Sequence, residues 1–265
     1  MAPSSFVAVR VAVFVPGSLN WNVPVLPNEA YAKRSYVCKR FDMHKYRETL
    51  YQNYYSTHSG KQDQSVQIQH FNQQVRYFER EFKHLMPSNK EAKILDIGCG
   101  TGSLIKALNN LGYSKTNGID LSVEQVKMAG VFGVTGIEQA DVNDYLKDKQ
   151  ETYDVIFAVD LIEHLAKDEL VNFLKMVRSG LNAGGQVIFR TPNMDAPLAS
   201  VFAFADFTHE VFLNKSSAKQ LLQSCGYQSV EVSEGIVFIE NSVKEIVRKV
   251  GWAITKILLK MQLFF

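Results

Sequence analysis

The residues that most clearly suggest chemistry form a glycine-rich loop, DIGCGTG, at positions 96–102. Glycines let the backbone turn sharply and let a ligand approach closely. A loop of this kind could also serve a dinucleotide. Asp96 favours another ligand, because a carboxylate directly before the glycines would repel a pyrophosphate but attract the ammonium of a methionyl group. The candidate ligand-binding positions within the loop are Gly98, Cys99, Gly100 and Gly102, with Cys99 interpreted as a tolerated small residue rather than a catalytic thiol.

Two further acids stand where the next two predicted strands end. Asp120 closes the second strand, where a carboxylate can accept hydrogen bonds from both ribose hydroxyls. Asp141 closes the third, where it can accept an adenine amino group while Val142 offers its backbone N–H. We also place Leu121 and Val159, at the ends of the second and fourth strands, against this ligand. Three acids at consecutive strand ends are far more specific than the glycine loop alone.

The stretches ILDIGCGTG, GIDLS and AD, which carry these acids, resemble class I S-adenosylmethionine-dependent methyltransferases over roughly residues 65–240. The resemblance implies S-adenosylmethionine as the methyl donor. It also implies a Rossmann-like α/β sheet of seven strands in the order 3-2-1-4-5-7-6, with the last strand antiparallel. Two other interpretations stay open: a nucleotide-binding α/β domain with another ligand, and an assembly factor that binds the cofactor without catalysis.

A second reactive group, DLIEH at positions 160–164, follows the predicted fourth strand, and His209 follows the fifth. If a helical turn begins at Asp160, then Asp160, Glu163 and His164 share one face. The same spacing is that of a helix capping box, which would make His164 an ordinary helix residue. A hydroxyl becomes a useful nucleophile when a base or a metal lowers its proton affinity, so His209 and His164 are candidate catalytic residues.

Carboxylates with two imidazoles can also bind a divalent cation. The pattern is similar to the ExxEH-plus-His metal site of the plant small-RNA 2′-O-methyltransferases and, at the helix motif, to ubiquinone-pathway O-methyltransferases. The resemblance implies Mg²⁺ or Mn²⁺ held by Asp160, Glu163, His164 and His209, with Asp160 shorter than the glutamate that it replaces. Between the two roles we favour His209 as a general base.

The segment from TPN at 191–193 to DFTHE at 206–210 is similar to methyltransferases of bacterial cell-surface polysaccharide gene clusters. This resemblance implies O-methylation of a sugar hydroxyl on a glycan or glycan precursor. The DLIEH motif suggests a quinone or phenolic precursor as the alternative acceptor. Aromatic residues in and after this segment could line an acceptor pocket or pack in the core equally well; they are Phe202, Phe204, Phe207 and Phe212.

Strands and helices alternate through the middle of the chain, which predicts a mostly parallel sheet with helices on both faces. The predicted strands cover 93–97, 137–141, 153–159 and 186–190, and residues 117–120 end a further strand after the first. A hairpin of 229–232 and 236–239 follows. The predicted helices cover 103–111, 123–131, 167–180 and 216–225.

The flanks divide the chain further. Residues 1–40 are expected to be an irregular extension, and residues 41–92 a helical lid whose apolar stripe runs from Ile68 to Leu85. The methyltransferase core covers 93–240. Residues 241–265 are expected to form a basic amphipathic helix, which could dock on the protein, on a second subunit in a homodimer, or on an anionic membrane surface.

Composition sets outer limits. A net charge of +2 argues against a nucleic-acid partner, which normally requires a basic face. The three cysteines lie far apart, which excludes a disulfide scaffold and fits a reducing compartment. We therefore expect a cytoplasmic enzyme, with the inner face of the membrane as its one alternative location.

Overall fold

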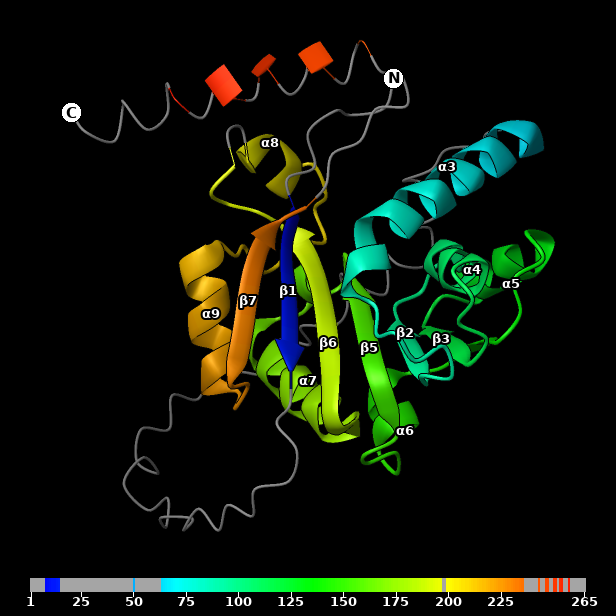
Figure 1. The fold of residues 1–265 in the computed structure, drawn as a ribbon, viewed down its shortest axis with the longest axis horizontal. Helices are drawn as coiled ribbons and strands as arrows, with labels where there is room; N and C mark the ends of the chain where they lie inside the picture. Colours follow the sequence, from blue (N-terminus) through cyan, green and yellow to red (C-terminus); the bar gives the residue numbers. More distant parts are fainter. Residues whose placement is uncertain are drawn as a thin grey trace.

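The computed structural model describes residues 8–14, 50, 63–196 and 199–235, and eight positions further on: 243, 246, 247, 250, 251, 253, 254 and 257. Within this part of the chain, strands and helices alternate around a single mixed sheet (Figure 1).

The sheet has the strand order β4-β3-β2-β5-β6-β1-β7. Its first five strands in this order are parallel, while β1 runs antiparallel to both β6 and β7. The strands are β1 (Ala8–Phe14), β2 (Ile94–Ile97), β3 (Thr116–Asp120), β4 (Ile137–Gln139), β5 (Tyr153–Val159), β6 (Leu181–Pro192) and β7 (Ser229–Glu234).

Helices cover both faces of this sheet (Figure 1). Along β5, Val155 and Phe157 pack in one core while Ile156 and Ala158 pack in the other, as alternation in a strand buried on both faces requires. The first core includes α3 (Gln64–Phe82), α4 (Ser103–Asn110) and α5 (Val123–Val131). The second includes α6 (Val142–Leu146), α7 (Lys167–Gly180) and α9 (Lys215–Ser224). Three short helices complete the set: η1 (Lys83–Leu85), η2 (Ile162–His164) and α8 (Ala199–Ala203).

The predicted five parallel strands and the helices between them are confirmed, with small shifts at the ends. The third strand stops at Gln139, and Asp141 instead caps α6, which the sequence did not suggest. In α3 the predicted stripe buries Phe71, Val75, Phe78 and Phe82. Ile68, which we placed on this stripe, is 42% exposed because it lies on the turn before the buried stretch.

The irregular extension predicted for residues 1–40 is wrong at residues 8–14, which form β1. This strand lies between β6 and β7, where the resemblance placed the seventh, antiparallel strand. β7 corresponds to the predicted strand at 229–232 and runs in the same direction as β6, whereas the predicted last strand at 236–239 lies outside the described residues. The segment AVRVAVF is rich in β-branched valine at alternate positions, and such a segment pairs well once two open strand edges are available.

Two other predictions fall largely outside the described residues. Residues 236–239, the second half of the predicted hairpin, are not described. In the predicted C-terminal helix, the eight described positions have helical backbone and exposed side chains, and the helix as a unit stays a prediction. Among the residues described, no helix is long and apolar enough to cross a membrane.

Candidate active site

The glycine loop between β2 and α4 has the backbone that its sequence predicts. Gly98, Gly100 and Gly102 all have positive φ, of 71°, 53° and 79°. A Cβ on Gly102 would lie 2.4 Å from the Cδ1 of Ile137, so this glycine is required for packing as well as for conformation. A Cβ on Gly100 would meet nothing closer than 3.8 Å, which leaves that side of the loop open for a ligand.

Asp96 and Asp120 face the loop from the ends of neighbouring strands. Asp96 is only 2% exposed, and its burial, with the nearby charge of Asp120, raises the pKa of its carboxyl well above the usual range. Asp120 accepts hydrogen bonds from the N–H groups of Gly100 and Ser122, each at 2.8 Å. Burial also raises the pKa of Asp120, while these two hydrogen bonds oppose the shift. A bound cation at this end of the site would favour the ionised forms of both carboxyl groups.

A cavity of about 320 Å³ opens beside the loop. Of the residues predicted to bind the cofactor, it is lined by Asp96, Gly98, Cys99, Gly100 and Val159. The remaining predicted positions, Gly102, Asp120, Leu121, Asp141 and Val142, are not among its lining residues.

The positions outside the cavity wall have distinct environments. Gly102 lies behind the loop, and Asp120 holds the loop by the Gly100 hydrogen bond. Leu121 is an apolar side chain left 65% exposed directly after Asp120, which suits the wall of an adenine site. Asp141 is exposed and accepts the N–H of Asn143 at 2.7 Å as the cap of α6. Burial raises the pKa of the Cys99 thiol, which therefore stays protonated, as expected for a structural residue.

Several lining residues were missed from the sequence. Helix α3 contributes Gln67, His70 and Gln74, whose polar side chains looked like an ordinary solvent face. Gln125 on α5 also lines the cavity, and its buried Oε1 atom has no hydrogen-bond partner among the described residues. An unsatisfied polar atom at this place fits a cavity that receives a polar ligand. Arg190 is the fifth of these missed lining residues. Its local sequence offers little reason to place it at a cavity, because arginine is rarely buried in a strand.

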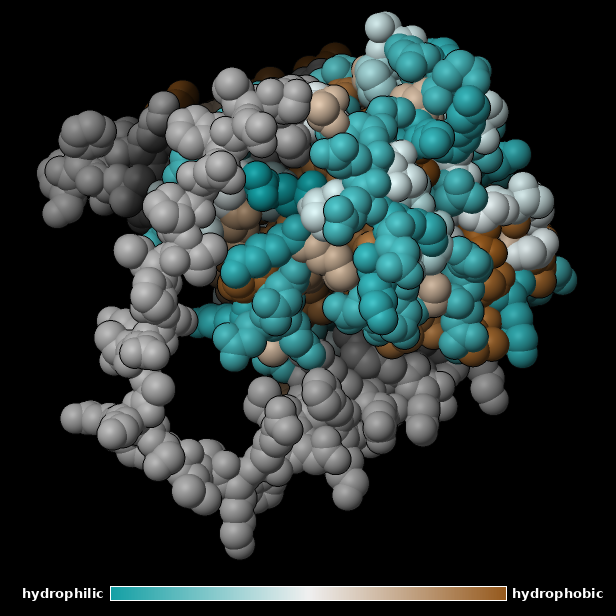
Figure 2. All heavy atoms as spheres, turned by 90° about the horizontal axis from the view of Figure 1, so that it is seen from below, coloured by the Kyte–Doolittle hydropathy of each residue, from teal (hydrophilic) through white to brown (hydrophobic). Residues whose placement is uncertain are grey.

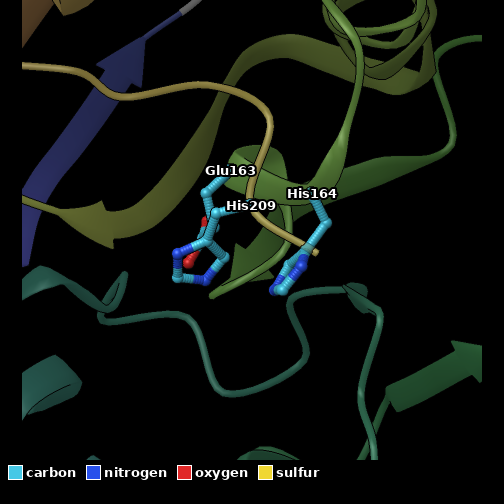
Figure 3. A group of neighbouring side chains, drawn as sticks. All are labelled: Glu163, His164 and His209. Carbon is cyan, nitrogen blue, oxygen red and sulfur yellow. The ribbon is translucent and has the colours of Figure 1, made fainter. Parts of the chain in front are cut away.

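The second reactive group brings together Glu163, His164 and His209, which we name the imidazole–carboxylate cluster. Glu163 and His164 come from η2, and His209 from the connection between α8 and α9. One potential ligand atom from each lies within 4.8 Å of the others, and the two imidazole rings have centroids 4.7 Å apart. Figure 3 shows the three side chains extending in the same direction from their two segments.

Hydrogen bonds fix the same tautomer in both imidazoles. The Nδ1 of His209 lies 2.8 Å from the carbonyl of Ala203, which can only accept, so Nδ1 carries the proton. The Nδ1 of His164 lies 2.8 Å from the Thr208 hydroxyl, which donates its own proton to Asp206 and so accepts from His164. In both rings Nε2 therefore carries the lone pair, as in histidines that act as bases or metal ligands.

Burial disfavours a charge on two members of the cluster, His164 and Glu163. Burial lowers the pKa of His164 to about 4, with a further contribution from His209. Glu163 is 2% exposed, and burial followed by the charge of Asp160 raises the pKa of its carboxyl well above the usual range. Its Oε2 atom is buried without a hydrogen-bond partner among the residues described. A carboxylate in this state is stabilised by a cation or by a proton.

Asp160 does not join the cluster, which corrects its predicted role as a metal ligand. Both of its carboxylate oxygens bind the guanidinium of Arg190, with an Oδ1–Nε distance of 3.0 Å. The capping-box interpretation is also wrong, because η2 begins at Ile162 and its N-cap, Leu161, provides no side-chain hydrogen bond. The physical reason is that a partner thirty residues away along the chain binds Asp160 more strongly than a local backbone N–H can.

An exposed aromatic patch, formed by Phe204 and Phe212, borders the cluster, and Phe207 precedes His209 by two residues in the chain. Phe204 is 72% exposed and Phe207 85% exposed, so core packing does not explain them. The Phe204 and Phe212 rings have centroids 4.9 Å apart, and the Phe212 ring lies 6.5 Å from that of His209. The side chain of Phe202 is outside the description. Such a patch beside reactive groups is typical of a binding surface.

A family model for a methyltransferase domain matches residues 68–257. The chain belongs to this family and is a class I S-adenosylmethionine-dependent methyltransferase, an enzyme. A solved S-adenosylmethionine-dependent methyltransferase from Archaeoglobus fulgidus superposes with a TM-score of 0.55 at 20% identity, covering 69% of this chain and 86% of that one. A likeness at this identity shows the fold.

Sequence relatives include ubiquinone biosynthesis O-methyltransferases. The protein of Idiomarina loihiensis is 30% identical over 106 residues, which is 38% of this chain and 42% of the relative. The human mitochondrial protein is 27% identical over 170 residues, covering 55% and 44%. A tRNA U34 carboxymethyltransferase of Campylobacter hominis is 30% identical over 113 residues, covering 39% and 37%. The matched part spans less than half the length of each of these relatives.

Proposed function

We propose that the enzyme transfers the methyl group to a hydroxyl oxygen of a small acceptor that lies between the cofactor cavity and the imidazole–carboxylate cluster. The cluster carries the proposal. Asp160 lines the cavity and Glu163 follows only three residues later, which supports an acceptor position between the two. Two imidazoles with matching tautomers and one buried carboxylate are groups that can remove a hydroxyl proton as the methyl group is transferred.

The donor set of the cluster fits a divalent cation. Glu163 offers a buried oxygen that lacks a partner, and each imidazole is oriented through its Nδ1–H by an oxygen of the protein. Two nitrogens and one oxygen suit a transition metal such as Mn²⁺ better than Mg²⁺, which prefers oxygen ligands. When bound, such a cation would supply Lewis-acid polarisation of the acceptor hydroxyl. We prefer the metal-assisted role over a base alone, because three donor atoms lie within 4.8 Å of one another without Asp160.

For the acceptor, we infer a phenolic or quinone precursor as the first candidate. The names of the O-methyltransferase relatives and the aromatic patch beside His209 both support it. A sugar hydroxyl on a glycan precursor is the second candidate, supported by the resemblance of the TPN-to-DFTHE segment to polysaccharide-cluster methyltransferases. A screen of catechols, phenols and nucleotide sugars for methyl transfer separates the two.

The decisive experiment compares chelation with substitution in the cluster. We expect a chelator to abolish turnover and Mn²⁺ to restore it. Glu163→Gln and His209→Ala should lose activity together, and the double variant should be no worse than either, because losing one ligand empties the same site. Affinity for S-adenosylhomocysteine should be unchanged in all three. Turnover that resists chelation and survives Glu163→Gln, but not His209→Ala, would instead establish His209 as a base alone.

A further inference from the structure

Arg190 joins three elements at one buried point. It lies near the end of β6 and is only 9% exposed. Its Nη1 is 2.9 Å from the Oε2 of Glu81, a fully buried residue of α3. Its Nε and Nη2 bind the two carboxylate oxygens of Asp160, directly after β5. One guanidinium therefore holds α3, β6 and the start of the segment that leads to η2.

The geometry is specific for arginine. The guanidinium carbon lies 5.0 Å from the ring centroid of Phe78 and 5.6 Å from that of Tyr77. Two carboxylates on different sides and two aromatic rings leave the side chain with one orientation. The planar fork of arginine can bind Asp160 through two nitrogens and Glu81 through a third, and a lysine ammonium cannot reproduce that arrangement.

Arg190 also controls the backbone of Asp160. Asp160 has φ of 52°, one of two non-glycine residues with positive φ in the described chain. Its N–H donates to the carbonyl of Arg190 at 2.9 Å, while its carboxylate is held by the same residue's side chain. A left-handed conformation in an ordinary residue persists where its surroundings impose it. Here the N–H and the carboxylate of Asp160 are both bound by Arg190.

The conformation of Asp160 determines where the next residues lie. Glu163 and His164 follow in η2, and the carbonyl of Glu163 accepts the N–H groups of Glu210 at 2.7 Å and Val211 at 3.1 Å. These two amides come directly after His209. The position of η2 therefore fixes both halves of the imidazole–carboxylate cluster.

We propose that Arg190 is a positioning residue for methyl transfer: it holds Asp160 in the conformation that brings η2 to His209, and through Glu81 it fastens this turn to the helix that walls the cofactor cavity. The inference rests on the proposed function for its effect on turnover, but not for its effect on η2. Because Arg190 also lines the cavity, removing it should loosen η2 and lower turnover far more than it lowers cofactor affinity.

The test measures amide hydrogen exchange, cofactor affinity and turnover in the full chain. Arg190→Lys keeps the charge without the fork, and Arg190→Met removes both. Arg178→Lys, on the exposed side of α7, is the matched control. In both Arg190 variants we expect exchange at residues 160–164 and 210–211 to rise about tenfold or more, while β2 and β3 stay protected. Turnover should fall by about 100-fold as the reacting groups are misplaced, a much larger fall than that in affinity for S-adenosylhomocysteine.

Two results would overturn the proposal. One is unchanged exchange at residues 160–164 and 210–211 in folded Arg190 variants. The other is a loss of S-adenosylhomocysteine affinity in proportion to turnover with η2 still protected, which would make Arg190 a cofactor ligand. A parent enzyme that methylates neither phenols nor sugars would refute the proposed function, but the exchange data would still decide the role of Arg190.

A second pair of variants keeps the proposal falsifiable if the Arg190 variants do not fold. Asp160→Gly and Asp160→Ala both remove the carboxylate, but only glycine adopts φ near 52° without strain. We expect η2 to be better protected, and turnover higher, in Asp160→Gly than in Asp160→Ala. Equal exchange in these two variants would show that the conformation of Asp160 does not position the turn.

Discussion

Asp96 has two opposing requirements at the residue scale. It must be buried to form the floor of the cavity, and burial disfavours its charge. Asp120 disfavours that charge further, and the positive charge of Arg190 offsets only part of the effect. A ligand that brings an ammonium group reverses the balance, because the ionised carboxylate then gains a partner. Cofactor binding should therefore displace a proton from Asp96.

This proton gives a pH-dependent affinity. Because the pKa of Asp96 is raised in the free protein, S-adenosylmethionine should bind more weakly as the pH falls, while the ligand's ammonium stays protonated. Asp96→Asn should weaken binding by about 1.5–3 kcal/mol at neutral pH and flatten this dependence. Calorimetry measures both, with Asp168→Asn on the exposed first turn of α7 as the control. Equal, pH-independent affinity in parent and variant would contradict this role.

Substitutions at Gly102 and Gly133 distinguish the cost of backbone strain from the cost of overpacking. Both have positive φ, of 79° and 71°. An added Cβ would lie 2.4 Å from Ile137 at Gly102 but would meet nothing within 4 Å at Gly133. Gly133→Ala should therefore cost about 1–2 kcal/mol of unfolding free energy for its backbone alone. Gly102→Ala should add about 1–3 kcal/mol for overpacking, and should weaken cofactor binding. Urea unfolding checks the difference, and equal losses would mean that the Ile137 contact is relieved without cost.

Sequence reasoning was strongest for residues whose role is local. The glycine loop needs positive φ at fixed positions, and a carboxylate at a strand end lies at the ligand edge whatever else surrounds it. Asp160 shows the limit, since its spacing to Glu163 predicted either a ligand or a cap. Its partner, Arg190, lies on another strand, and no local pattern indicates which charged residues will meet there.

Helices and strands also differ in whether local sequence or a distant partner sets their bounds. The strand at 153–159 and the helices at 123–131 and 167–180 have the predicted bounds, because each carries its own apolar period. β6 is longer than predicted, running from Leu181 to Pro192, because β1 and β5 extend the pairing on both sides. β1 itself could not be placed from the sequence, since both its partners lie more than 160 residues away.

The place of β1 predicts what its removal would do. It lies between β6 and β7, whereas the cofactor loop follows β2 and contacts β3, beyond β5 in the sheet. Deleting residues 1–16 should expose two unpaired strand edges and lower the unfolding free energy. Cofactor affinity should stay within about threefold, a difference below 1 kcal/mol.

A point variant tests the same strand in the complete chain. Val11→Pro removes a backbone donor from the middle of β1, so it should destabilise the protein in the same direction as the deletion. Denaturant unfolding measures stability, and calorimetry with S-adenosylhomocysteine measures the site. Loss of cofactor binding in either folded variant would show that β1 supports the cavity.

At the scale of the whole molecule, the two reactive groups use one edge of the sheet. The cofactor loop follows β2, and the imidazole–carboxylate cluster follows β5 and β6, so both stand at the carboxyl ends of parallel strands. Figure 2 shows the molecule from below, away from this edge, and there the coloured surface is mostly polar. The two reactive groups thus follow neighbouring strands of one sheet, and α3 is joined to this edge through Arg190.

Ligand binding should therefore stabilise the whole fold through the cofactor half of this edge. A ligand at about 100 times its Kd adds about 2.7 kcal/mol to the unfolding free energy, which corresponds to roughly 5–10 °C in Tm for a domain of this size. We expect S-adenosylhomocysteine to produce this shift in the parent and in His209→Ala, because His209 is absent from the cavity wall. Asp96→Asn should show a smaller shift at the same concentration, since it removes the partner of the ammonium. The deletion of residues 1–16 should start from a lower Tm yet keep the full increment, because β1 lies outside the ligand's contacts. A missing increment in His209→Ala would show that the cluster itself binds the cofactor, and acceptor chemistry would then have to be placed elsewhere on this edge.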